Sequence, residues 1–154
     1  MKIYLDTCCY GRPFDEARQS QERVETEAEI IGDVAGLCKA LGFPVLGSAT
    51  LINEINDITD DEKRACVQGL YDCVVSYHIK KTDDITRRAQ ELKELGLKRG
   101  DPYHVAYAEA AEVDFLLTAD TKLERAASKL NLNVAVISPI NFLPEVERWR
   151  QLLT

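Results

Sequence analysis

Short runs of strand-forming residues alternate with helical patterns along the whole chain, and this alternation limits the fold more than any single motif. The runs are rich in β-branched and aromatic residues, and the segments between them have apolar residues three or four positions apart. Strands joined by helical crossovers lie parallel in one sheet. The expected strands are Lys2–Leu5, Pro44–Gly47, Val74–Ile79, Phe115–Thr118 and Val134–Ile137.

The segments between these strands have recognisable helix signals. In the longest one, apolar residues recur at intervals of three or four, and Gly42 follows as a stop. The polar stretch Gly11–Ser20, which contains Pro13, is expected to be a loop. The expected helices are Gln21–Leu41, Ala49–Ile58, a stretch from Asp61, a helix capped by Thr82 and running to about Leu95, Asp101–Glu112, Thr121–Leu130 and Pro144–Leu153.

The length and the absence of linkers set the domain organisation. At 154 residues the chain can bury a real core, and it has no internal repeat, low-complexity tract or Pro/Ser-rich linker. Five strands with helical crossovers therefore predict a single three-layer α/β/α domain over residues 1–154, with a parallel sheet.

Charge and hydropathy restrict the surroundings of the protein. The formal net charge of −7 disfavours a protein that coats nucleic acid or an anionic membrane, because phosphate binding depends on Lys and Arg. It leaves room for a nucleic-acid enzyme with a local basic rim. No apolar run approaches 18 residues and no signal-peptide pattern opens the chain, so we expect a cytoplasmic protein.

The cysteines give little support to a disulfide framework or a zinc site. Their number, five, is odd, and no pair has C-x-x-C spacing. This favours buried thiols in a reducing compartment, with only the adjacent pair accessible enough to react. The five are Cys8 and Cys9, which form that pair, and Cys38, Cys66 and Cys73.

Four acids occupy positions that a parallel sheet would bring to one edge. Asp6 follows the first strand, Glu54 lies in the helix after the second, Asp101 opens a helix, and Asp120 follows the fourth strand. Strand ends and the helices that follow them meet at the edge where ligands bind. Crowded carboxylates repel one another, and a hard divalent cation removes that repulsion. The pattern therefore predicts a Mg²⁺ or Mn²⁺ site.

Each acid also has a purely structural interpretation. Asp101 before Pro102 and Asp120 before Thr121 are good helix N-caps, and Glu54 could be a solvated helix residue. Asp6 has the weakest structural explanation, because no helix obviously begins there. The joint pattern carries more weight than any single member.

Several motifs together resemble the PIN domain family of metal-dependent ribonucleases, which includes the VapC-type toxins of toxin–antitoxin pairs. The resemblance spans essentially the whole chain. Its most specific part is an acid-opened, Ala-rich helix that leads into a hydrophobic strand ending in T-x-D. The segments that carry it are LDT (5–7), NEI (53–55), GDPYHVAYAEAAEVDFLLTAD (100–120) and VISPINFL (136–143).

The resemblance implies a sheet order of 3-2-1-4-5 and a metal site. Position by position, the acids of that site match Asp6, Glu54, Asp101 and Asp120, and the hydroxyls of Thr7 and Thr118 match positions that support these ligands. Two features depart from the family pattern. Many relatives have Asn where this chain has Cys8, and the charged stretch Asp15–Glu29 is unlike the shortest toxins.

The implied reaction is hydrolysis of RNA phosphodiester bonds, assisted by one or two metal ions. No Ser/His/Asp or Cys/His nucleophile set is visible, and His104 is interpreted as a packed helix residue. A covalent-aspartate phosphatase would need a second Asp at position 8, which is Cys. A phosphoacceptor signalling domain would need an acceptor Asp after the third strand, where Lys80 and Lys81 stand. A non-catalytic binding module with the same fold remains an alternative, although the acid set is complete.

An RNA substrate needs positive charge near these acids. Arg12 lies in the loop after the first strand, and Lys98 and Arg99 directly precede Gly100 and Asp101, so all three cations are expected to border the acidic edge. The resemblance also implies an antitoxin partner that covers the site, and we expect a homodimer. A stand-alone RNA-processing nuclease is the alternative biological role.

Overall fold

The computed structural model describes residues 1–15 and 21–154, and it contains a five-stranded parallel sheet with the order β3-β2-β1-β4-β5. The predicted parallel sheet and its 3-2-1-4-5 order are therefore confirmed. The central strand β1 pairs with β2 and β4, so that Tyr4 lies beside both Leu46 and Leu116. The strands are β1 (Ile3–Leu5), β2 (Val45–Gly47), β3 (Tyr77–His78), β4 (Phe115–Leu117) and β5 (Ala135–Ile137).

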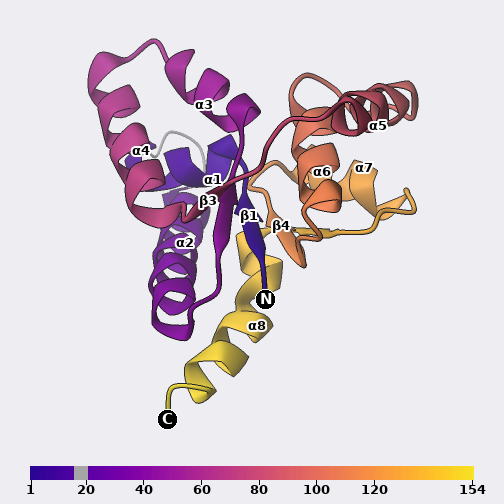
Figure 1. Ribbon diagram of the computed structural model, residues 1–154. Helices are drawn as coiled ribbons and strands as arrows, with labels where there is room; N and C mark the ends of the chain where they lie inside the picture. The colour runs from indigo at the N-terminus through magenta and orange to yellow at the C-terminus, as the bar shows by residue number, and fades with distance from the viewer. Residues whose placement is uncertain (16–20) are drawn as a thin grey trace.

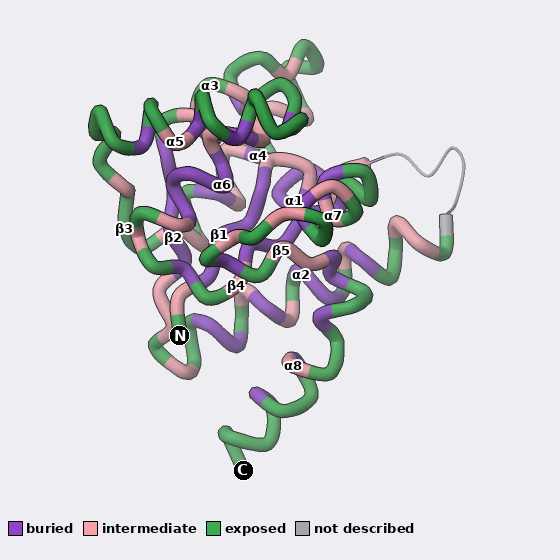
Figure 2. The backbone as a smooth tube through the Cα atoms, turned by 90° about the vertical axis from the view of Figure 1, so that its right-hand side faces the viewer, coloured by how far each residue is buried: buried purple, intermediate pink, exposed green. Residues whose placement is uncertain are grey.

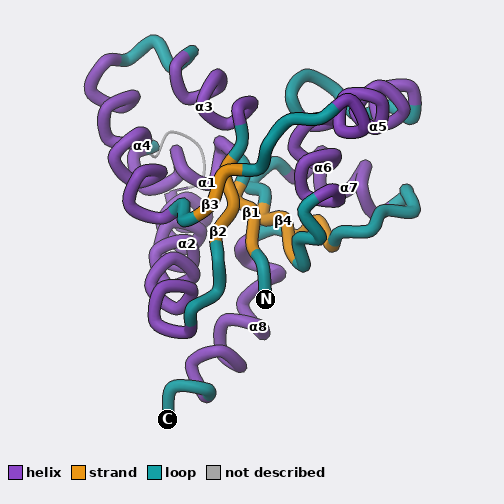
Figure 3. Tube along the Cα trace, in the orientation of Figure 1, coloured by secondary structure: helices purple, strands orange, loops and turns teal. Residues whose placement is uncertain are grey.

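Helices cover both faces of the sheet, which gives the expected three layers (Figures 1 and 3). Helices α2 and α4 lie on one side, and α5, α6 and α7 lie on the other, while α8 packs against α2. The helices are α1 (Thr7–Gly11), a 3₁₀ turn η1 (Arg12–Phe14), α2 (Gln21–Leu41), α3 (Ala49–Asn56), α4 (Asp61–Val74), α5 (Asp83–Glu94), α6 (Asp101–Ala110), α7 (Thr121–Ser128) and α8 (Pro139–Gln151).

The core lies between the sheet and both helical layers, where the buried segments of Figure 2 run through the strands and the inner faces of the helices. Ile3, Tyr4 and Leu5 of β1 are completely buried. Phe142 and Trp149 attach α8 to the rest of the molecule through edge-to-face ring contacts with Phe115 and Phe43, respectively, and they also contact each other within the helix. None of the described helices combines the length and apolar character that crossing a membrane requires.

Two predicted elements begin three or more residues away from their observed starts. The third strand is only Tyr77–His78, because Val67, Tyr71 and Val74 keep the helical spacing and extend α4 to Val74. The last helix begins at Pro139 rather than Pro144, since the Ser138 hydroxyl caps it and proline suits its first position.

The segment after β1 is also more ordered than the predicted loop. Residues 7–14 form α1 and η1, and the final part of the predicted Gly11–Ser20 loop, residues 16–20, lies outside the described residues. A five-residue helix is too short to produce a periodic apolar pattern, so it has no clear sequence signal.

The prediction of buried cysteines is correct for only part of the set. Cys9 and Cys38 are buried and Cys8 is partly buried, but Cys66 and Cys73 are exposed. Both exposed thiols belong to α4, whose buried face carries Val67 and Tyr71 instead.

Candidate active site

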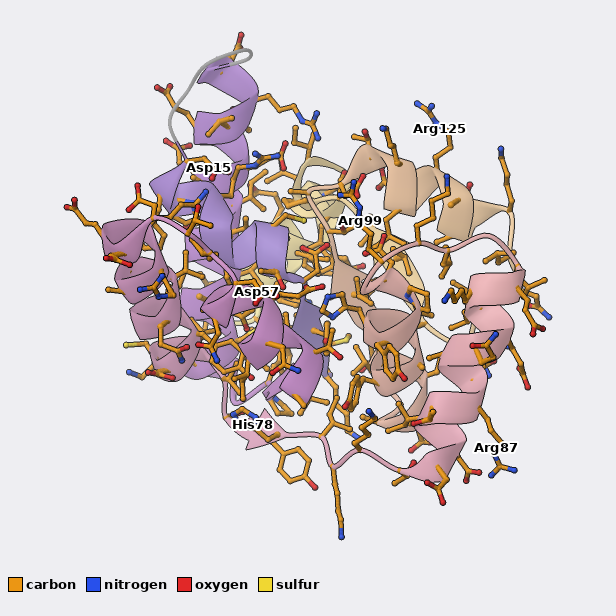
Figure 4. All side chains as sticks on the ribbon, turned by 90° about the horizontal axis from the view of Figure 1, so that it is seen from above. Asp15, Asp57, His78, Arg87, Arg99 and Arg125 are labelled. Atoms are coloured by element: carbon orange, nitrogen blue, oxygen red, sulfur yellow. The ribbon has the colours of Figure 1, made fainter. Side chains whose placement is uncertain are left out.

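The structure brings the four predicted acids together around one cavity of about 360 Å³ at the carboxyl edge of the sheet. Asp6 follows β1, Glu54 lies in α3, Asp101 begins α6, and Asp120 follows β4. Because all five strands are parallel, their carboxyl ends meet at this edge. Figure 4 looks down on this edge, with Arg99 near its middle.

Asp6 is buried, and it both lines the cavity and caps a helix. It is the N-cap of α1, and its Oδ1 accepts hydrogen bonds from the Cys9 amide at 3.1 Å and from Cys8 Sγ at 2.8 Å. Burial raises the pKa of Asp6 above its ordinary value, although bonds from Cys8 and Thr118 oppose this. The expectation that no helix begins here is therefore wrong, and the cap explains how a buried carboxylate is tolerated.

Asp120 also combines a cap with a place on the cavity wall. Its Oδ1 accepts hydrogen bonds from the backbone amides of Lys122 and Leu123 at 2.9 and 3.4 Å, as the sequence predicted for an N-cap of α7. The buried hydroxyl of Thr118 accepts a bond from the Asp120 amide at 3.0 Å. Thr118 therefore fixes the turn that presents Asp120.

Glu54 is held by two side chains rather than by a helix end. Its Oε1 accepts a hydrogen bond from the Thr7 hydroxyl at 2.5 Å and lies 2.7 Å from His104 Nε2. Burial would raise the pKa of Glu54, but the bonds from His104 and Thr7 outweigh it, so the pKa lies below its ordinary value. Glu54 is therefore ionised at neutral pH.

His104 connects this carboxylate to the core through a chain of polar groups. The Tyr4 hydroxyl lies 2.6 Å from His104 Nδ1 and 2.7 Å from Ser48 Oγ, and all three side chains are buried. Since an ionised Glu54 can only accept, the proton of this contact belongs to His104 Nε2. His104 is packed, as predicted, but it also orients Glu54.

Asp101 is the least constrained of the four acids. The prediction that it caps α6 is wrong, because Gly100 occupies the cap position and the Asp101 side chain makes no hydrogen bond to the described residues. Burial raises its pKa to about 6, and the charges of Asp6, Asp120 and Glu54 add to the rise, while His104 opposes it. The raised pKa of Asp101 therefore reflects, in addition to burial, the repulsion from the other carboxylates of the cavity.

The three predicted cations are placed differently from one another. Arg99 lines the acidic cavity, and Lys98 lines a second cavity beside it. Arg12 contacts Asp15 at 3.1 Å and the buried Glu27 at 3.5 Å, and it is absent from the lining of the acidic cavity. Arg12 therefore lies next to Asp15 of the cavity lining, but its guanidinium is engaged by these two carboxylates.

Lys63 is a cation that the sequence reasoning missed. It lines the acidic cavity from α4 and contacts Asp15 at 2.6 Å. No local pattern marks it, because its contact partner Asp15 lies 48 positions away in the sequence. His104 was also missed as a site residue, although its spacing of three from Asp101 places both on one face of α6.

The acidic cavity has the donor groups that a divalent cation needs, but not the close convergence of its described side chains. The donor chemistry suits Mg²⁺ or Mn²⁺, because the four predicted acids and Asp15 line one cavity, and burial with mutual repulsion raises the pKa of Asp101 to about 6. As the described side chains are placed, no three His, Cys, Asp or Glu residues converge closely enough to hold a metal ion. The donor set therefore fits in chemistry, and binding would require at least one carboxylate to rotate inward.

No protein-family model matches the sequence, and no curated protein matches it. The resemblance to PIN domains therefore stays a prediction.

Proposed function

We propose that this protein is a metal-dependent ribonuclease of the PIN-domain type, which hydrolyses RNA phosphodiester bonds with Mg²⁺ or Mn²⁺. The observation that carries the proposal is the lining of one cavity, at the carboxyl edge of a parallel sheet, by acids from four separate segments. Helix capping explains the positions of Asp6 and Asp120, but it does not explain Glu54 and Asp101, whose charges add to the repulsion in the same cavity.

The proposed roles follow from the environment of each side chain. Asp6, Asp101, Asp120 and Glu54 would hold the divalent cation. When bound, the cation lowers the pKa of a water molecule and stabilises negative charge on the scissile phosphate. Glu54 is ionised, and its Oε1 is engaged by Thr7 and His104. Its second oxygen, Oε2, is the atom available to accept a proton from the attacking water.

Two cations supply the charge that an RNA backbone needs near these acids. Arg99 lines the acidic cavity, and Lys98, the residue before it in the same loop, lines the adjacent cavity. We assign to them the contacts with substrate phosphates, which hold the chain against the repulsion of the carboxylates.

A cleavage assay tests the proposal. Purified protein should cut a labelled mixed pool of single-stranded RNA with Mn²⁺ or Mg²⁺ and not in EDTA, and Asp6→Asn or Asp101→Asn should abolish the cutting. Asp57→Asn is the matched control, because Asp57 is exposed near the same edge and does not line the cavity (Figure 4). Wild-type activity in Asp101→Asn would show that the site is wrong.

Metal binding can be measured without activity. Millimolar Mn²⁺ should raise the melting temperature of the wild-type protein by mass action, and should raise that of Asp101→Asn less. A wild-type melting temperature that ignores both Mn²⁺ and Mg²⁺ would contradict a metal site. RNA binding without any cleavage would instead favour a non-catalytic module.

We further propose that the ribonuclease is the toxin of a toxin–antitoxin pair, with a stand-alone processing nuclease as the alternative. Crowded carboxylates at one cavity would attract an Arg or Lys side chain from a protein that covers the site. Expression alone in a host cell separates the two roles. Growth arrest that disappears in Asp6→Asn supports the toxin, whereas normal growth with an active purified enzyme supports the processing role. The homodimer remains a prediction that sedimentation can test.

A further inference from the structure

A second cavity, of about 580 Å³, adjoins the acidic one between the loop before α6 and helix α7. The two cavities share Arg99, Asp101 and Asp120 in their linings. The volume falls within the range of about 300–1,000 Å³ that is typical of small-molecule sites. A ligand group bound here would therefore lie directly beside the candidate active site.

The lining of this second cavity is amphipathic. Leu97 and Leu123 are buried and Ala126 is partly buried, so the inner wall is apolar. Lys98, Arg99 and Lys122 are exposed and stand at the opening. An apolar wall beside exposed cations fits a ligand that combines an apolar body with negative charge.

These three cations have no carboxylate partner within ion-pair distance among the described residues, and all three line one cavity. Elsewhere, Arg12, Arg88 and Arg150 each contact two carboxylates. Positive charge that the fold leaves unpaired at one opening is available to an anionic ligand.

The backbone at Arg99 has an uncommon conformation. Arg99 has a φ of 57°, in the left-handed region that non-glycine residues rarely adopt. This turn places Arg99 in the lining of both cavities. By contrast, Figure 4 shows Arg125 of α7 at the outer rim, projecting away from the cavities.

We propose that the second cavity binds one nucleotide of single-stranded RNA, next to the bond that is cut. This inference rests on the proposed ribonuclease function. The base packs on Leu97, Leu123 and Ala126, and the adjoining phosphates contact Lys98, Arg99 and Lys122. A base can enter such a cavity only when it is unstacked, so the substrate is a single strand or a loop rather than a duplex.

The test measures RNA affinity in EDTA, where no cleavage occurs, with a fluorescein-labelled single-stranded RNA octamer. Lys122→Ala should weaken binding about threefold to tenfold and should make the log–log salt slope shallower by about 0.7, the value for one lost phosphate contact on a single strand. Lys129→Ala is the matched control, because Lys129 is exposed at the end of the same helix and does not line the cavity. It should bind like wild type.

A second variant tests the apolar wall. Ala126→Leu puts extra volume into the cavity, so it should weaken RNA binding without changing the salt slope. Wild-type melting temperatures in both variants would show that the fold is intact. A direct readout is the set of amide NMR shifts around Lys98 and Lys122, which should respond to a nucleoside 5′-monophosphate more strongly than to ribose 5-phosphate.

The outcomes separate this inference from the proposed function. If wild type binds and cleaves RNA while both variants bind like wild type, the subsite is wrong and the ribonuclease stands. If the variants lose affinity but no metal supports cleavage, the subsite stands and the enzyme is wrong. No RNA binding by wild type overturns both. A polyglutamate peptide that displaces the octamer at equal charge concentration would overturn the assignment of a nucleotide.

Discussion

Glu54 Oε2 lies so close to the Cα atom of Gly100 that a Cβ atom at position 100 would overlap the carboxylate. The backbone at Gly100 has φ −81° and ψ −12°, which any residue adopts, so only the close approach of Glu54 disfavours a larger residue here. The start of α6 thus fixes one side of Glu54, while Thr7 and His104 fix the other.

Gly100→Ala should therefore impair the site without unfolding the protein. The added methyl group meets the end of a flexible side chain, so the Glu54 carboxylate moves and loses its contacts with Thr7 and His104. We expect RNA cleavage to fall about tenfold or more, since small misplacements of reacting groups cost that much. Gly69→Ala is the control, because nothing lies within 4 Å of its Cβ position. Equal cleavage by Gly100→Ala and wild type would contradict the role of Glu54.

Tyr4→Phe should destabilise the fold by about 1–3 kcal/mol, the usual effect of leaving buried polar groups without a partner. The variant keeps the ring but removes the hydroxyl that contacts Ser48 and His104. Urea unfolding measures the change. Ser48→Ala should destabilise the Tyr4→Phe variant less than it destabilises the wild-type protein, because both substitutions disrupt the same chain of hydrogen bonds. Strict additivity would show that the chain is not coupled.

The stability of the metal-free protein should fall as the pH rises from about 4 to 6, in part through Asp101. Its folded-state pKa of about 6 lies above the ordinary value of 3.8, so the folded protein holds this proton more tightly than the unfolded chain does. The stability from this proton is complete below the lower value and is lost as the pH rises through the upper one.

Asp101→Asn isolates this contribution, because it removes the titrating group. In EDTA at pH 7.5 the variant should melt a few degrees above wild type, and the gap should close towards pH 4. Partial exposure of Asp101 to solvent limits the size of the gap. A difference that stays constant across this range would mean that another group governs the pH dependence.

Glu27→Gln should lower the free energy of unfolding by about 1–3 kcal/mol, less than for a fully buried ion pair, because the Arg23 side chain is partly exposed and water can replace its partner. The Glu27 side chain is almost completely buried and contacts Arg23 at 2.5 Å and Arg12 at 3.5 Å. Arg23 also donates to the carbonyl of Ala119, next to Asp120, at 3.0 Å. Glu29→Gln is the control on the exposed face of α2, and a Glu27 variant as stable as this control would contradict the prediction.

The sheet could be predicted because its information is local. Five apolar runs separated by helical segments indicate parallel strands, and the resemblance to PIN domains gave the order that the structure has. The gathering of the acids followed from this topology, since Asp6 and Asp120 end neighbouring strands, and parallel strands end at one edge.

The contacts around the acids could not be predicted, because they join residues that are distant in sequence. The residues next to Arg12 in the sequence do not indicate that it contacts Glu27. The residues next to Glu54 do not indicate that it contacts His104, which lies 50 positions away. Helix α1 was not predicted because about one and a half turns are too short to show a periodic pattern of apolar residues. These contacts decide which charges are available to a ligand and which are already balanced within the fold.

The four acids of the cavity differ in how firmly the chain holds them. Backbone amides bind Asp6 and Asp120, and neighbouring side chains bind Glu54, whereas the Asp101 side chain has no hydrogen-bond partner among the described residues. Three of the four carboxylates are therefore held in place by hydrogen bonds to described residues, and the Asp101 carboxylate is not. The Asp101 carboxylate can rotate without breaking a hydrogen bond to the described residues, while the bonds that hold the other three acids stay intact.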